Sequence, residues 1–404
     1  MSDSAKSDLI YHPCDLGIDN DPYPVWKRLR EEAPLYYNEE HDFYALSRWD
    51  DVELALLEWR LYRSGRGTIY EVVKANIDIP PGIILWEDPP IHDLHRNLLT
   101  RVFTPKAMND IEPLVRQFCV RALEPLRDAQ SFDVIKDFAE LLPMRTIGYL
   151  LGIPENDQRA IRDRTDEAID ISNNGGAGSP DAVDFEHATD LFGDYVDWRA
   201  KHPSDDLMTQ LLYAEVEENG EKRKLTRTEV LTYTSMIAGA GNETAARLIG
   251  FTTQLLAEHP DQRREIHQNR ALIPGAIEEV LRYEAPSPVQ ARYLAEDVVH
   301  HGRTVPKDAV MLLINGSANR DPRHFQDPDR FDIHRKTPSR PHLTFGYGIH
   351  HCLGAALARL EGRIALEEMI NLWPDWKVDP SRGVKAHTSS VRGWASLPVS
   401  VGAA

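Results

Sequence analysis

The sequence predicts a mostly α-helical protein with small β-sheets, built as a single large domain. Apolar residues recur with helical spacing from about residue 105 to 218 and in long runs further on. Strand-like alternation is confined to short segments, at 35–46, 298–314 and 391–401. No internal repeat and no long Pro/Gly/Ser linker divides the 404 residues. One fold is therefore expected, although a single core usually stops growing at about 250–300 residues.

The N-terminal part, about residues 1–60, is predicted to be richer in β-structure than the rest. Alternating apolar residues at 35–37 and 43–46 predict a β-hairpin, and 49–59 predicts a helix. Residues 63–93 contain several prolines and glycines, so continuous regular structure is not expected there. The apolar side chains of this loop either pack against the body or line a site.

A helical core is expected over about residues 88–372. The helices are predicted at 107–127, 133–151, 155–171, 182–201, 205–217, 226–258, 273–284 and 353–372. The run that Thr226 caps has about 33 residues and a length of about 50 Å, so it should cross the whole molecule. The glycine-rich stretch 173–180 is either a surface turn or the tip of a mobile lid. A hairpin-like segment at 298–314 and two strands near 391–401 complete the prediction.

Composition excludes several classes of protein. The chain has 46 basic and 64 acidic residues and a formal charge of −18, which disfavours non-specific binding to nucleic acids or anionic membranes. Its three cysteines, Cys14, Cys119 and Cys352, are odd in number and far apart, which favours a reducing compartment over a disulfide framework. With no apolar signal core at the N-terminus, we expect a cytoplasmic protein without a membrane span.

The most informative local pattern is a glycine-rich loop directly before a helix. It reads Phe345-Gly346-Tyr347-Gly348-Ile349-His350-His351-Cys352-Leu353-Gly354. A cysteine at a helix N-terminus is favoured as the thiolate, which is the form that a soft metal centre needs. An arbitrary lone cysteine is more often a small buried hydrophobe. Zinc held by Cys352 with His342, His350 and His351 is a weak alternative, because the spacing matches no common zinc motif.

The loop resembles the cysteine loop of the cytochrome P450 haem-thiolate monooxygenases in their soluble bacterial form. The defining positions are Phe345, Gly348, His350, Cys352 and Gly354. The resemblance implies haem b as cofactor, with Cys352 as the axial ligand of the iron. It also implies that Phe345 and the adjoining Gly346 border the haem and that His350 contacts a propionate.

A second motif is Glu279-Val280-Leu281-Arg282 in the predicted helix 273–284. A Glu and an Arg three residues apart can pair, and most such pairs are surface bridges of little consequence. In the resembling family this pair meets an arginine from a downstream Pro-x-Arg-Phe segment, here Arg330. The implied role of Glu279, Arg282 and Arg330 is to support the loop that bears Cys352.

A third motif, Ala240-Gly241-Asn242-Glu243-Thr244, interrupts the long apolar helix with a glycine and polar side chains. Such locally costly residues are often functional, although Glu243 and Thr244 could simply face solvent. By resemblance this is the oxygen-activation segment, in which Glu243 and Thr244 are catalytic and deliver protons. Ala240 and Gly241 would border the haem.

The fourth motif is His92-x-x-x-Arg96, which follows Asp88-Pro89-Pro90. Two cationic donors one helical turn apart suit a carboxylate, and they resemble the family's propionate-binding pair. Arg292 resembles the remaining propionate partner. Alone, His92 and Arg96 would more often be surface residues.

Together the motifs predict a monooxygenase that hydroxylates a hydrophobic small molecule such as a lipid, terpenoid, steroid or polyketide. No segment resembles a flavin or iron–sulfur module, so electrons are expected from ferredoxin and an NAD(P)H-dependent reductase, and the enzyme is expected to be a monomer. Substrate contacts are predicted at Ile83, Leu85, Trp86, Ile237 and Val289, although single apolar residues are more often core. The alternatives are a haem-thiolate peroxygenase, which would not need Glu243 and Thr244, and a non-catalytic haem protein that binds a gas.

Overall fold

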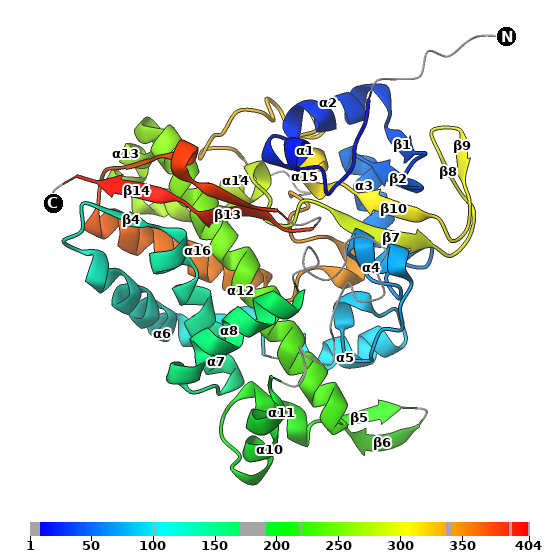
Figure 1. Cartoon of the computed structure of the whole chain (residues 1–404), viewed down its shortest axis with the longest axis horizontal. Helices are drawn as coiled ribbons and strands as arrows, with labels where there is room; N and C mark the ends of the chain where they lie inside the picture. The colour runs from blue at the N-terminus through cyan, green and yellow to red at the C-terminus, as the bar shows by residue number, and fades with distance from the viewer. Residues whose placement is uncertain are drawn as a thin grey trace.

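The computed structural model describes residues 9–100, 102–169, 191–218, 220–336, 341–387 and 390–402. Figure 1 shows a β-rich side, where strands from distant parts of the chain lie together, and a larger helical side crossed by one long helix, α12 (Arg227–Glu258). The fold is mostly α with small β-sheets, as the sequence predicts. Within the described ranges, no helix is both long and apolar enough to cross a bilayer.

The largest sheet joins the N-terminal hairpin to strands about 250 residues later in the chain. β1 (Leu35–Asn38) and β2 (Phe43–Leu46) form the predicted antiparallel hairpin. β10 (Val310–Leu313) pairs parallel with β2 and antiparallel with β7 (Gln290–Leu294), which also pairs with β3 (Tyr62–Arg63). All four residues of β10 are buried, so this strand lies inside the sheet. Smaller sheets contain β4 (Ser131–Asp133) with β11 (Trp376–Val378) and β14 (Pro398–Val401), β5 (Glu215–Glu218) with β6 (Glu221–Lys224), β8 (Val298–His300) with β9 (Arg303–Val305), and β12 (Val384–His387) with β13 (Arg392–Ser396).

The helices follow the predicted order. They are α1 (Leu16–Asn20), α2 (Tyr23–Glu32), α3 (Trp49–Leu57), α4 (Tyr70–Ala75), α5 (Ile91–Thr100), α6 (Pro105–Leu123), α7 (Leu141–Leu151), α8 (Glu155–Ile169), α10 (Gly193–Lys201), α11 (Leu207–Tyr213), α12, α13 (Pro260–Gln268), α14 (Ile273–Tyr283), α15 (Asn315–Ala318) and α16 (Ala355–Leu372), with short helical turns at η1 (Ile84–Trp86), η2 (Glu124–Leu126), η3 (Ile135–Ala139), η4 (Arg270–Leu272), η5 (Gly348–His350) and η6 (Pro380–Arg382). The predicted turn at 173–180 lies outside the described residues.

Helix α12 is the central element of the helical side. Thr226 caps it through a capping box, in which its hydroxyl accepts from the Glu229 N–H and the Glu229 carboxylate accepts from the Thr226 N–H. The 32 residues span about 48 Å. The helix packs against α7, α8, α14 and α16, and most of its side chains are buried in the main hydrophobic core.

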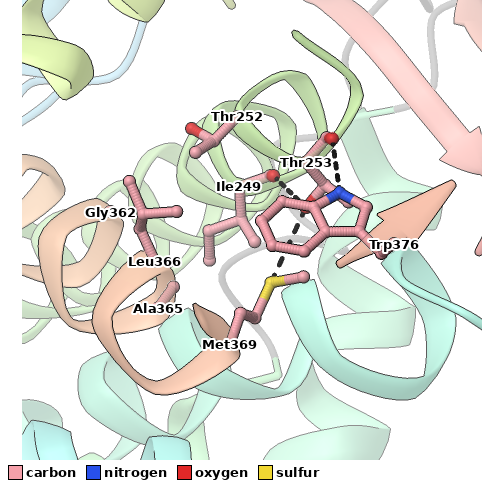
Figure 2. A pocket seen from close by; sticks show the side chains of 8 residues that line it. All are labelled: Ile249, Thr252, Thr253, Gly362, Ala365, Leu366, Met369 and Trp376. Carbon is pink, nitrogen blue, oxygen red and sulfur yellow. Dashed lines mark hydrogen bonds between the residues drawn. The ribbon is translucent and has the colours of Figure 1, made fainter. Parts of the chain in front are cut away.

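The angle between α12 and α16 is fixed at a tightly packed junction with β11. Figure 2 shows its lining residues, which are Ile249, Thr252, Thr253, Gly362, Ala365, Leu366, Met369 and Trp376. The Trp376 Nε1–H donates to the Thr253 carbonyl at 2.9 Å, and the Thr253 hydroxyl reaches the Met369 sulfur at 3.7 Å. Gly362 lets the helices approach, since a Cβ there would lie 3.0 Å from Leu248 Cδ2. This junction packs the C-terminal half of α12 against α16.

Several predicted elements differ from the structure. The predicted helix 133–151 is divided, because residues 131–133 form β4 and η3 precedes α7. The predicted helix 205–217 ends at Tyr213. It is followed by the short β5–β6 hairpin, in which Gly220 has a φ of +82°. Part of the loop 63–93 is helical in α4 and η1. The segment 298–314 contains the β8–β9 hairpin, but β10 leaves it for the large sheet. In β4 and the β5–β6 hairpin, strand pairing overrides the helical periodicity of the sequence.

Candidate functional site

The cysteine loop folds as two tight turns directly before α16. Gly346 and Gly348 have φ of +66° and +70°, the left-handed region that favours glycine. A Cβ at Gly348 would also lie only 2.7 Å from the Leu56 carbonyl oxygen, so this turn rests on α3. The Cys352 N–H donates to the Phe345 carbonyl at 2.8 Å and closes the loop. The glycine pattern therefore holds Cys352 three residues before α16 begins at Ala355.

Cys352 keeps accessible surface, but many protein atoms surround its side chain and reduce its contact with bulk water. Burial raises the pKa of its thiol, and the Gly354 N–H and the charges of Arg96 and Arg359 only partly oppose this. The N–H at the start of the helix thus favours the thiolate, as expected, but desolvation outweighs it and the net pKa of the thiol is raised. Direct coordination by a metal ion deprotonates a thiol outright.

Four cationic or imidazole side chains from three separate segments meet near the cysteine loop. They are His92 and Arg96 from α5, Arg292 from β7 and His350 from η5. The His92 and His350 rings lie 4.5 Å apart between centroids. Burial, together with Arg292, His92 and Arg96, lowers the pKa of His350 to about 2. The four residues predicted to bind propionates are thus brought together.

This cluster fits an acidic cofactor. Arg292 is 3% exposed, burial lowers its pKa to about 10, and no carboxylate among the described residues forms an ion pair with it. The Nε2 atoms of His92 and His350 are buried without a hydrogen-bond partner in the described part of the chain. Buried cations and imidazoles of this kind are stabilised by an anion. The two propionates of haem beside an accessible cysteine meet this need, so the residues present fit haem.

The middle of α12 has an accessible face although most of the helix is buried. Met236, Gly239, Ala240, Glu243 and Thr244 keep accessible surface, and their spacing of three and four residues places them on one side. The Thr244 hydroxyl donates to the Ala240 carbonyl at 3.0 Å. The predicted acid, alcohol and Ala240 therefore share a face, as a proton-delivery segment requires.

Glu243 is held by an ion pair along its own helix. Arg247 Nη2 lies 3.0 Å from Glu243 Oε1, and Arg247 Nη1 donates to the Trp394 carbonyl of β13. Gly393 makes room for this arginine, since a Cβ there would lie 2.6 Å from Arg247 Cδ. The carboxylate is thus fixed in position while 30% of the Glu243 side chain remains exposed.

On α12, Gly241 has a packing role and one predicted substrate contact needs correction. The absence of a side chain at Gly241 serves helix packing, because a Cβ would lie 2.7 Å from Ile147 Cδ1 of α7, and its place beside the cofactor stays a prediction. Ile237, predicted to contact substrate, is 5% exposed and packs in the main core. The preceding residue, Met236, lies on the accessible face instead, because neighbouring residues of a helix point about 100° apart. Sequence reasoning missed Met236, although its four-residue spacing from Ala240 could have indicated it.

The remaining predicted substrate contacts are divided between surface and core. In the loop before α5, Leu85 is 42% exposed, whereas Ile83 is buried and the half-buried Trp86 donates from Nε1 to the Thr68 hydroxyl at 3.0 Å. Val289 packs in the hydrophobic cluster around the large sheet. Leu85 is therefore the most accessible of this group.

The Glu-x-x-Arg pair is buried and bidentate. Arg282 donates to Glu279 at 2.7 and 2.8 Å, and both side chains are 2% exposed. The third member is Arg335, whose Nε lies 3.0 and 3.1 Å from the two Glu279 oxygens. The prediction of Arg330 is wrong: its side chain is exposed, and only its carbonyl takes part, accepting from Arg282 and Arg335. The chain turns after Phe331, which brings residue 335 back to Glu279.

Hydrogen bonds connect Glu279, Arg282 and Arg335 to the segment just before the cysteine loop. The Arg282 Nη1 donates to the Asn319 carbonyl, and the Asn319 side chain binds the Leu343 N–H and the Thr344 hydroxyl just before Phe345. The neighbouring Glu278 accepts from Arg359 of α16 at 2.6 Å. Support of the Cys352 loop by Glu279 and Arg282 remains a prediction, and these hydrogen bonds are consistent with it.

The described residues contain no group of side chains suited to bind zinc. Among those residues, no group of three or more His, Cys, Asp or Glu side chains could hold a metal ion. His342 instead lies 3.3 Å from Glu278. The described residues therefore offer no zinc site at Cys352, and its role as axial haem ligand stays a prediction.

Comparison with known proteins shows to which family the chain belongs. The family profile described as Cytochrome P450 matches residues 194–393. Putative cytochrome P450 123 of Mycobacterium tuberculosis is 34% identical over 398 residues, covering 98% of this chain and 97% of that protein. Polyketide biosynthesis cytochrome P450 PksS of Bacillus subtilis is 32% identical over 413 residues, 97% of this chain and 99% of that protein. The crystal structure of CYP109E1 from Bacillus megaterium in complex with testosterone has a TM-score of 0.84 and 29% identity, covering 95% of this chain and 98% of that one. The chain belongs to the cytochrome P450 family and is a haem b monooxygenase.

Proposed function

We propose that this monooxygenase hydroxylates a hydrophobic small molecule, with electrons from ferredoxin and an NAD(P)H-dependent ferredoxin reductase. The observation that carries the proposal is the accessible face of α12. There the apolar Met236 and Ala240 adjoin the polar Glu243 and Thr244. An apolar substrate would bind beside Met236 and Ala240, while Glu243 and Thr244 would deliver protons.

Relatives support a large apolar substrate. PksS is named for polyketide biosynthesis, and the CYP109E1 structure contains testosterone. Both names indicate bulky, mostly hydrophobic molecules. The exposed Leu85 in the loop before α5 offers this chain an apolar contact for a molecule of that class.

Each polar residue has a defined task in this proposal. Cys352 binds the iron, and His92, Arg96, Arg292 and His350 hold the propionates. Haem, when bound, supplies the oxygen chemistry. The Thr244 hydroxyl donates its own proton to the Ala240 carbonyl, so its lone pairs are free to accept a hydrogen bond from water. Glu243, partly exposed and fixed by Arg247, would pass protons from solvent to that water.

The proton-delivery role is tested by Thr244→Ala. We expect NAD(P)H oxidation to continue while product yield falls and peroxide is released, because the ordered water loses its partner. Thr252→Ala is the matched control, since its hydroxyl makes the same bond to the residue four positions earlier, at 2.8 Å, but faces the α16 junction. Unchanged coupling in Thr244→Ala would contradict the role. Efficient turnover with peroxide alone would favour a peroxygenase.

The metal ligand is tested by Cys352→Ser. The reduced, carbon-monoxide-bound native protein should show the red-shifted Soret band of haem with a cysteinate ligand, and the variant should lose it. A variant that keeps the shifted band would show that another residue is the ligand.

The electron donor is tested by reconstitution. Turnover should require both ferredoxin and its reductase, and it should stop when ferredoxin is left out. We further propose a cytoplasmic location, because all three cysteines are free, including the exposed Cys14.

A further inference from the structure

A buried polar cluster connects the loop before α5 to the first turns of α12. Its centre is His95, a fully buried residue of α5. On one side the His95 Nδ1 contacts both oxygens of Glu87, at 2.9 and 2.8 Å. On the other side the His95 Nε2 lies 3.8 Å from Glu229 Oε1 of α12. Neither carboxylate is assigned to haem or to proton delivery.

The imidazole of His95 lies between two buried carboxylates, one of which is also paired with an arginine. Glu229 accepts from Arg223 of β6 at 2.8 and 2.9 Å; although burial opposes it, Arg223 and the Thr226 cap lower the pKa of Glu229 to about 2. The Arg223 guanidinium contacts Glu229 alone, and His95 lies between the two carboxylates. Its Nδ1 is within hydrogen-bond distance of Glu87, and its Nε2 points toward Glu229 at 3.8 Å. Tyr233, whose ring lies 5.4 Å from that of His95, closes the cluster, and burial raises the pKa of its phenol.

The Glu87 carboxylate also joins the two ends of segment 82–87, which carries the accessible Leu85. Glu87 Oε1 accepts from the Gly82 N–H at 2.7 Å, so residues 82 and 87 are tied together around η1. Gly82, with φ +105°, rests directly on α12, since a Cβ there would lie 3.2 Å from Thr232 Cβ. Segment 82–87 is thus tied to itself by Glu87 and to α12 through His95 and Glu229.

We propose that Glu87, His95 and Glu229 form a clamp that holds segment 82–87 closed against α12 and so limits the size of molecule that reaches the haem. They are positioning residues, because they act through the segment and not on the substrate. The inference rests on the proposed function only where it takes this segment to border the substrate. Since α5 also carries His92 and Arg96, one helix serves the haem and the clamp.

The clamp is tested with haem-binding probes of two sizes, imidazole and 4-phenylimidazole, whose association with the ferric holoenzyme is followed by stopped-flow absorption. His95→Gln and Glu87→Gln should each speed 4-phenylimidazole binding by about tenfold, equivalent to about 1.4 kcal/mol, and leave imidazole binding within about twofold. A merely structural role would affect both probes alike. His334→Gln is the matched control, because it breaks a His–Glu pair of 2.7 Å that is exposed on the surface.

Hydrogen exchange of segment 82–87 gives a second measurement on the same proteins. Its amides should exchange faster in both clamp variants and not in His334→Gln. Equal effects on the two probes, or no effect on either, would overturn the proposal, and so would faster exchange without a change in probe binding. If His95→Gln fails to load haem, Glu87→Gln decides. Neither measurement depends on turnover, so a failure of the proposed hydroxylation would be recognised separately.

Discussion

Glu361 provides a prediction whose size follows from the structure. It lies on α16, is 1% exposed, and has one carboxyl oxygen without a hydrogen-bond partner among the described residues. Burial raises the pKa of Glu361 from 4.5 to about 8, and the hydroxyl of Thr146 on α7 only partly opposes the shift. The folded protein therefore holds a proton on Glu361 at neutral pH, whereas the unfolded chain does not.

The sign and size of the pH effect follow from this difference. Between the unfolded value of 4.5 and the folded value of about 8, the native state binds one proton more than the unfolded state. Stability then falls by about 1.4 kcal/mol for each pH unit of increase. From about pH 5 to about pH 7.5 the loss amounts to about 3 kcal/mol. Glu361→Gln cannot ionise, so it should match the native protein near pH 5 and be about 3 kcal/mol more stable near pH 7.5.

The assay is urea unfolding of both holoproteins at the two pH values, followed by circular dichroism. Glu258→Gln, an exposed residue at the end of α12, is the control and should show no such pH-dependent gain. Infrared spectroscopy should detect a protonated carboxylic acid at neutral pH that disappears in Glu361→Gln. A stability difference that is the same at both pH values, or the absence of that acid band, would refute the reasoning.

Three further variants test the site. Arg335→Ala removes two hydrogen bonds to a buried carboxylate and should cost about 1–3 kcal/mol of stability with lower haem content, whereas the exposed Arg330→Ala should stay within about 0.5 kcal/mol; equal losses would contradict the assignment. Gly348→Ala must adopt a left-handed backbone and should cost at least about 1–2 kcal/mol in urea unfolding, whereas Gly402→Ala, at an exposed position without a close neighbour, should be nearly neutral. A neutral Gly348→Ala would show that the turn relaxes. Arg292→Leu removes a buried cation, so the apoprotein should keep its stability while haem transfers faster to a haem-scavenging protein; unchanged haem retention would exclude Arg292 from the propionate site.

The sequence predicted the elements whose causes lie within a few residues. Thr226 and Glu229 form a capping box, and α12 accordingly begins at the predicted residue. Gly346 and Gly348 supply the left-handed turns of the cysteine loop. Thr244 and Ala240 are four residues apart on one helix, so their hydrogen bond needs no distant partner. Helical spacing and glycine sterics are local properties. The family was recognised separately, by the resemblance of the loop around Cys352 to the family's cysteine loop.

Other features could not be predicted because they depend on how distant segments pack. Arg335, rather than Arg330, reaches Glu279 because of the turn after Phe331. The pKa of Cys352 is raised because desolvation by the surrounding protein exceeds the effect of the helix terminus.

The fold class, the long helix, the cysteine loop and the order of the motifs could be predicted from the sequence. Tertiary packing was needed to show that His92, Arg96, Arg292 and His350 meet at one place, that Met236 and not Ile237 lies on the accessible face of α12, and that His95 lies between Glu87 and Glu229. Backbone sterics and capping act over a few residues, whereas burial and side-chain partners arise when segments far apart in the chain pack together, as Arg392 and Asp19 do.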